Sequence, residues 1–126
     1  MLLHLTDLSP EPLHEQISRQ IRAQILAGTL EPGTALASIR ALAREQKVSV
    51  ITVQRSYDDL LRAGLLLSRR GKGFFVAPLA EQQKQDMALA RVRDKLSEVV
   101  REAMAEGLNG ALVRRAFNDA LKEGDR

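Results

Sequence analysis

Cysteine is absent from this chain of 126 residues, which excludes disulfides, thiolate chemistry and cysteine-based zinc sites. Aromatic residues make up only 3%, so stacking on unpaired bases is a poor candidate for the main binding mode. The two histidines, His4 and His14, lie apart without an acidic cluster, which argues against a metal site. Asp58 and Asp59 are adjacent and diverge on a helix, so paired acid–base catalysis is not expected. An enzyme is therefore the weakest interpretation, and we predict no cofactor.

Long apolar runs are absent as well. No stretch approaches the roughly 20 apolar residues that a membrane-crossing helix requires. The first residues, MLLHLTDLSPEP, have no basic segment, and His4 and Asp7 interrupt their apolar side chains, unlike a secretory signal peptide. We therefore expect a cytoplasmic protein with no membrane partner.

Basic charge is concentrated in the middle of the sequence. Residues 38–75 contain eight basic and three acidic side chains, a net charge of +5, whereas residues 79–126 contain nine of each sign. The eight basic residues are Arg40, Arg44, Lys47, Arg55, Arg62, Arg69, Arg70 and Lys72. A basic centre beside a neutral tail favours a polyanionic partner for the centre, although a solvated basic surface would give the same pattern.

An amphipathic helix is predicted over Leu13–Ala27, directly after Pro12, because proline is well placed at a helix start. Apolar residues that recur every four positions define its buried face: Leu13, Ile17, Ile21 and Ile25. Gly28 is expected to end this helix, and Glu31-Pro32-Gly33-Thr34 to form a turn.

Two further helices, joined by about three residues, form the next predicted unit. Ser38 is expected to cap the first, which ends near Gln46, and Ser49 the second, which runs to about Ala63. The second helix carries apolar residues on one face, which we expect to be buried: Val53, Tyr57, Leu60 and Leu61. This spacing makes Tyr57 a core residue rather than a base-stacking one, and the pair of helices is typical of a helix-turn-helix.

Two short apolar strands, Leu65–Ser68 and Phe74–Ala77, follow these helices. The stretch between them, Arg69-Arg70-Gly71-Lys72-Gly73, is basic and contains glycine, as expected for the tip of a hairpin. A helix-turn-helix followed by such a hairpin predicts a mainly α fold with a small β-hairpin wing, the winged helix-turn-helix, over residues 1–78.

Residues 79–126 are predicted to form a two-helix dimerisation tail. Over residues 81–105 apolar side chains alternate three and four apart, as in a coiled coil: Leu89, Val92, Leu96, Val99 and Ala103. Leu108-Asn109-Gly110 interrupts this pattern, and residues 111–122 place a second apolar set on one side: Leu112, Ala116, Phe117, Ala120 and Leu121. Two helices cannot cover both faces with each other alone, so we predict a homodimer; the alternative is packing back on the same chain.

Five motifs follow one another between residues 12 and 77: PLHEQI (12–17), ILAGTLEPG (25–33), LASIRALA (36–43), VSVITV (48–53) and GKGFFV (71–76). Together they resemble the N-terminal domain of the GntR family of bacterial transcriptional regulators. The short tail and the VITVQRSY run (50–57) are similar to the small YtrA-type members. This resemblance implies a tail that mainly dimerises the protein, and many such members control transporter operons.

Two positions depart from the family pattern. Ala37 stands where the family often has proline, and Val50 and Gln54 stand where many relatives have arginine. The resemblance therefore carries over the mode of DNA binding, whereas the base contacts should differ.

The predicted DNA-binding residues belong to three short segments. They are Ser38 and Arg40 at the start of the first helix of the pair, Ser49, Val50, Ile51, Thr52, Gln54 and Arg55 on the recognition helix, and Arg69, Arg70, Gly71 and Lys72 at the wing tip. Val50 and Ile51 are suited to thymine methyl groups, Thr52 and Gln54 to base edges, and Arg55 to phosphate. The alternative for the apolar pair is burial under the wing.

The sequence thus predicts a homodimeric regulator, a repressor, that binds an inverted-repeat operator in double-stranded DNA. It leaves open whether an unidentified small-molecule effector acts on it. The competing hypothesis is a winged-helix module that binds other proteins and no DNA. Such a module would not need the central charge of +5, which favours DNA.

Overall fold

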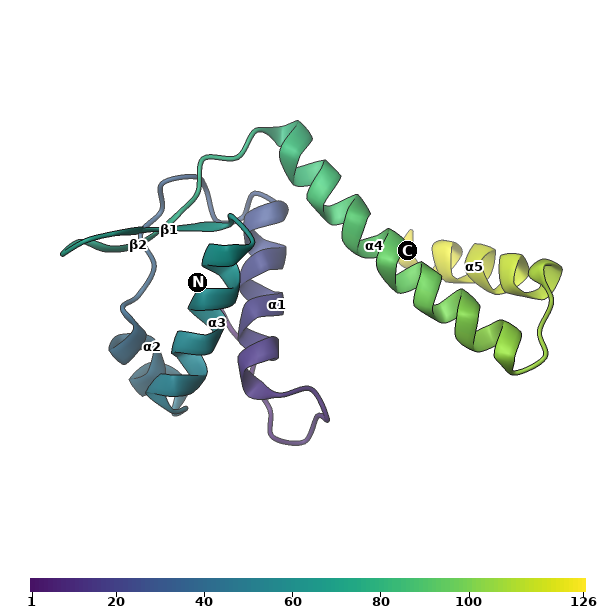
Figure 1. Ribbon diagram of the computed structural model, residues 1–126, viewed down its shortest axis with the longest axis horizontal. Coiled ribbons are helices and arrows are strands. Elements are labelled where there is room, and N and C mark those ends of the chain that lie inside the picture. Colours follow the sequence, from purple (N-terminus) through teal and green to yellow (C-terminus); the bar gives the residue numbers. More distant parts are fainter. The chain divides into compact units, whose positions relative to one another are not determined.

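The computed structural model describes residues Met1–Arg126, which divide into two compact units, Met1–Gln85 and Asp86–Arg126. The chain forms α1 (Leu13–Leu26), α2 (Ile39–Gln46), α3 (Val50–Arg62), β1 (Leu66–Arg69), β2 (Gly73–Val76), α4 (Glu81–Ala105) and α5 (Gly110–Gly124), as Figure 1 shows. This order confirms the predicted fold, mainly α with a small β-hairpin wing. None of the helices combines the length and the apolar character needed to cross a bilayer.

The core of the first unit lies between α1 and α3. Apolar side chains from both helices are at most 1% exposed: Ile17, Ile21, Ile25, Val53, Tyr57 and Leu60. The hydroxyls of Ser18 and Ser56 lie 2.9 Å apart in this contact and form a buried hydrogen bond between the helices. Both predicted apolar stripes are confirmed except at Leu13 and Leu61, each of which lies at the edge of its stripe and is only half-buried.

A ladder of glutamines, which the sequence analysis did not predict, holds the N-terminal arm against α1. The Gln16 side chain accepts the N–H of Thr6 and donates to the Thr6 carbonyl, and the Gln20 side chain does the same with His4. These four hydrogen bonds are 2.7–3.0 Å long. The Gln24 amide donates to the Leu2 carbonyl over 2.8 Å. Four residues of helix and two residues of extended chain both advance by about 6 Å, so the two spacings match. The arm is therefore an ordered part of this unit.

The wing is an antiparallel hairpin whose paired residues run from Leu66↔Val76 to Arg69↔Gly73. The strands lie one residue closer to the tip than predicted, because pairing continues through Arg69 and Gly73 and leaves only residues 70–72 in the turn. The free edge of β2 is bonded to the segment before α2: the Leu36 N–H donates to the Phe74 carbonyl over 2.9 Å. This second row of bonds fixes the wing relative to the start of α2.

Tyr57 connects three elements of the first unit. Its hydroxyl donates a 2.7 Å hydrogen bond to the carbonyl of Ala37, the residue before the cap of α2. Its ring packs edge-to-face on Phe74 of β2, with centroids 4.9 Å apart. Burial raises the pKa of Tyr57 above its ordinary value, so the hydroxyl stays protonated and able to donate. The prediction of a core role for Tyr57 is confirmed, and its hydroxyl adds a polar contact.

The second unit consists of most of α4 and all of α5. Asn109 caps α5 by accepting the Leu112 N–H over 3.0 Å, and Gly107, with φ of 94°, ends the preceding turn. No side chain between residues 86 and 126 is buried. The two predicted helices are confirmed, and neither has a core to pack on within this unit.

We expect Tyr57→Phe to lower the free energy of unfolding by about 1 kcal/mol, because it removes one hydrogen bond and preserves the ring. Urea unfolding followed by circular dichroism measures the difference. Ile51→Ala, at an exposed position, serves as the control and should change stability by less than about 0.5 kcal/mol. Equal stability of Tyr57→Phe and wild type would show that the bond to Ala37 contributes nothing.

Candidate nucleic-acid interface

A serine caps the start of each helix of the pair, α2 and α3. Ser38 Oγ accepts the Ala41 N–H over 3.1 Å, and Ser49 Oγ accepts the Thr52 N–H over 3.0 Å. Both caps were predicted and both are confirmed. Between the helices Lys47 adopts a left-handed conformation, with φ of 57°, that ends α2 and turns the chain toward α3. Its exposed ammonium adds a cation to this turn.

The hydroxyl groups of the caps retain protons that can be donated to a ligand. Ser49 Oγ and Thr52 Oγ1 lie 2.8 Å apart, so one of their two protons is used between them and the other is free. Ser38 Oγ accepts a bond from Ala41 and keeps its own proton. Each helix start therefore offers one hydroxyl donor to an acceptor such as a phosphate oxygen.

The first turns of α3 present both apolar and polar side chains to solvent. Val50 is 43% exposed and Ile51 is 69% exposed, while Gln54 and Arg55 one turn later are exposed as well. Positions three and four apart on a helix are neighbours, so these four side chains form one continuous surface. The exposure of Val50 and Ile51 excludes the alternative that the wing buries them.

Four cations of the predicted DNA-binding segments are not neutralised within the protein. Arg40, Arg55, Arg70 and Lys72 are exposed and form no ion pair, whereas the ion pairs of the first unit involve Arg19, Arg62 and Lys84. Unpaired cations on one unit attract a polyanion most strongly at low salt. The charge that the sequence places in its central third is thus available to a ligand.

The wing tip carries its cations on a tight turn. The Lys72 N–H donates to the Arg69 carbonyl over 2.9 Å, and Gly71 adopts φ of 74°, which favours glycine. The Arg69 guanidinium lies 5.4 Å from the centre of the Phe75 ring, across the hairpin. This contact orients Arg69 along the strand and leaves Arg70 and Lys72 at the tip.

The structure brings the three predicted DNA-binding segments into one unit. The start of α3 follows the end of α2 across the turn at Lys47, and β2 is bonded to the segment that leads into α2. The predicted dimerisation residues belong to the second unit, on α4 and α5. Sequence reasoning gave no role to Lys47 in the turn or to the Tyr57 hydroxyl. The sequence did contain a signal for each: Lys47 is a cation directly after α2, and Tyr57 is the one residue with a hydroxyl group in the apolar stripe of α3.

Comparison with known proteins identifies the family to which the chain belongs. Residues 13–76 match the family described as bacterial regulatory proteins, gntR family. The chain is 35% identical to the HTH-type transcriptional regulator YhcF of Bacillus subtilis, over 78% of this chain and 76% of YhcF. It is 26% identical to the HTH-type transcriptional repressor YtrA of the same organism, over 85% of this chain and 82% of YtrA. The protein belongs to the GntR family and is similar to its small YtrA-type members.

A solved structure resembles the first unit more specifically. The DNA-binding domain of AraR, in complex with operator ORX1, superposes with a TM-score of 0.52 and 31% identity. The match covers 60% of this chain and 93% of the AraR domain. The winged helix-turn-helix predicted from the sequence is therefore confirmed as the fold of this family, while the individual DNA contacts stay predictions.

We predict that Arg40→Ala weakens binding to a specific DNA site by about 1–3 kcal/mol, the range of a good base contact. The exposed Arg40 at the start of α2 carries no ion pair that its loss would disturb. Fluorescence anisotropy with a labelled duplex measures the change. Arg62→Ala is the matched control, because Arg62 lies in the last turn of α3 and pairs with Asp59. An Arg40 variant that binds like the Arg62 control would remove Arg40 from the interface.

Proposed function

We propose that this protein is a homodimeric transcriptional repressor that binds an inverted-repeat operator in double-stranded DNA. The observation that carries the proposal is the exposed start of α3, flanked by unpaired cations, in the fold that AraR uses on its operator. In helix-turn-helix proteins the N-terminal residues of the second helix reach base edges in the major groove. The wing tip, with Arg70 and Lys72, is suited to the adjacent backbone or minor groove.

The composition of the second unit supports pairing of two copies. Conformational entropy lost on folding must be offset by burial, yet no side chain between residues 86 and 126 is buried. All large members of the predicted seam are exposed in a single copy: Leu89, Val92, Leu96, Val99, Leu112, Phe117 and Leu121. Ala103 is half-buried. A second copy would cover these side chains and supply the missing core.

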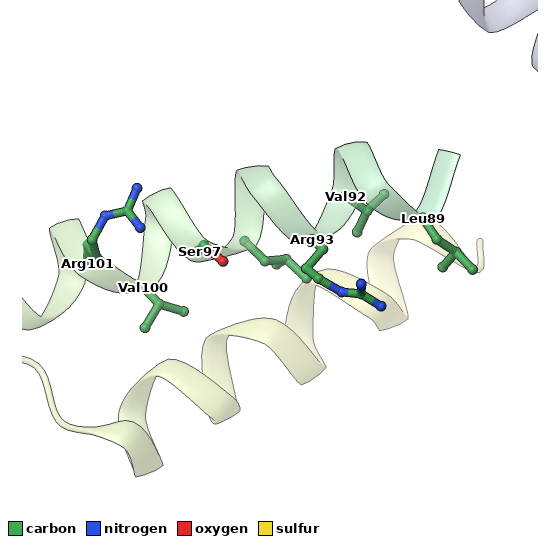
Figure 2. Close-up of a pocket in the computed structure, with 7 residues that line it drawn as sticks. Leu89, Val92, Arg93, Ser97, Val100 and Arg101 are labelled. Carbon is green, nitrogen blue, oxygen red and sulfur yellow. The ribbon is translucent and has the colours of Figure 1, made fainter. Parts of the chain in front are cut away.

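Two surfaces of this unit are suited to a partner helix. A groove of about 640 Å³ lies between α4 and α5 and is lined mainly by apolar side chains, among them Val99 and Phe117. Along α4, Leu89, Val92 and Val100 line a second hollow beside Arg93 and Arg101 (Figure 2). Apolar centres with charged rims are typical of protein interfaces. The occupant we propose is the same segment of a second copy.

Two-fold symmetry of such a dimer determines the form of the operator. A symmetric pair presents two recognition helices related by rotation, and these read the same sequence on opposite strands. The expected site is therefore an inverted repeat, with one half-site for each first unit. The similarity to YtrA-type members extends the proposal to operators upstream of transporter genes.

The competing function, a protein-binding module, is favoured by no specific contact. A partner protein would need acidic groups opposite Arg40, Arg55, Arg70 and Lys72, whereas DNA supplies regularly spaced phosphates. The repressor proposal is tested by incubating the purified full chain with fragmented genomic DNA and footprinting the retained fragments. We expect inverted-repeat footprints and an affinity that falls by about 0.9 log units per phosphate contact for each tenfold rise in salt. Retention of random fragments alone would overturn the proposal.

We expect Val99→Glu to convert the dimer into a monomer, because the new carboxylates would have to be buried in the paired seam. Val99 is 56% exposed in a single copy, so the monomer itself should fold normally. Ala90→Glu introduces the same charge at an exposed position off the seam and should remain dimeric. Light scattering during gel filtration measures both masses, and a dimeric Val99→Glu variant would contradict the assignment of the seam.

A further inference from the structure

The apolar surface at the start of α3 has no function in the core. Three apolar residues of this helix, Val53, Tyr57 and Leu60, are at most 1% exposed and complete its contact with the rest of the unit. Val50 and Ile51 lie outside that contact and stay in solvent. Two adjacent branched side chains beside unpaired cations indicate a ligand that combines negative charge with apolar groups.

Duplex DNA meets both requirements. Its phosphates supply the charge, and the 5-methyl of thymine is the apolar group that its major groove offers. A protein partner would need an acidic surface with an apolar centre to match this region. No other feature of the first unit points to such a partner. The exposed Arg40 and Arg55, which form no ion pair, are suited to the phosphates of such a duplex.

The side chains at the start of α3 also limit which bases they can recognise. Guanine is read best by arginine or lysine bonded to its O6 and N7 atoms, and residues 49–54 contain neither. Gln54, which is exposed, has the amide that pairs with adenine N6 and N7. Thr52 is half-buried and bonded to Ser49, which leaves the outermost positions to the apolar pair. This set of residues favours A·T base pairs.

We propose that Val50 and Ile51 read the 5-methyl groups of thymine, so that the operator's specificity depends on these methyl groups. The inference rests on the proposed function, because it assumes that α3 enters the major groove. It goes further by naming the chemical group that is recognised. Arg40, on α2, is left as the residue that contacts other positions of the half-site.

The test uses an operator enriched from a random duplex pool by the full-length protein. Each thymine of one half-site is then replaced in turn by deoxyuridine, which removes only the 5-methyl group. We expect at least one replacement to weaken binding about fourfold, the factor for losing one buried methyl group. Full-strength binding of the operator with every thymine replaced would overturn the inference while leaving specific DNA binding intact.

Variants assign the effect to the two side chains. With Val50→Ala and Ile51→Ala combined, thymine and deoxyuridine operators should bind equally, because the contact is already lost. Leu8→Ala is the matched control: Leu8 is 95% exposed on the N-terminal arm, and its variant should keep the full sensitivity to deoxyuridine. Sensitivity that persists in the double variant would mean that Val50 and Ile51 do not read the methyl groups, which overturns the inference. If no duplex is enriched at all, the proposed function fails first.

Discussion

The hydrogen bond from the Tyr57 hydroxyl to the Ala37 carbonyl connects the elements that carry the predicted DNA-binding residues. It joins the middle of α3 to the residue that precedes the Ser38 cap, and the same ring packs on Phe74 of the wing. One buried side chain thus fixes the recognition helix, the start of α2 and the hairpin relative to one another. Because the three predicted DNA-binding segments flank these contacts, their geometry is set by the core rather than by the ligand.

The two units differ in how they are stabilised. The first has a closed core and an arm fastened by Gln16, Gln20 and Gln24, whereas the second has no buried side chain between residues 86 and 126. A domain without a core gains stability by association. In the proposed dimer, pairing of two copies would therefore give the tail its core. The same pairing would supply the second DNA-binding unit that an inverted-repeat operator requires. Operator affinity would then depend on protein concentration.

Local patterns were sufficient to predict most of the fold. The four-residue spacing in α1, the serine caps and the glycine-bearing tip each depend on neighbours in sequence, and the structure confirms them. Features that depend on distant residues were not predicted: the glutamine ladder joins segments up to 22 positions apart, and the bond of Tyr57 reaches back 20 positions. The burial of Leu13 and Leu61 and the ends of the two strands were predicted slightly wrongly, because tertiary packing decides which residues at the edge of a stripe are buried and where the pairing of a hairpin ends. For the site, sequence indicated the residues, and the structure added their exposure and the unpaired state of their cations.

Whether the start of α3 and the wing tip bind DNA is tested most directly by a nuclear magnetic resonance titration of the full-length, isotope-labelled protein with its operator. It follows every backbone amide and so shows which face of the protein meets DNA. We predict that shifts concentrate at residues 38–40, 49–55 and 69–72, while the outer side of α1 and the N-terminal arm change little. Shifts confined to the arm or to α5, with the start of α3 unchanged, would contradict this prediction.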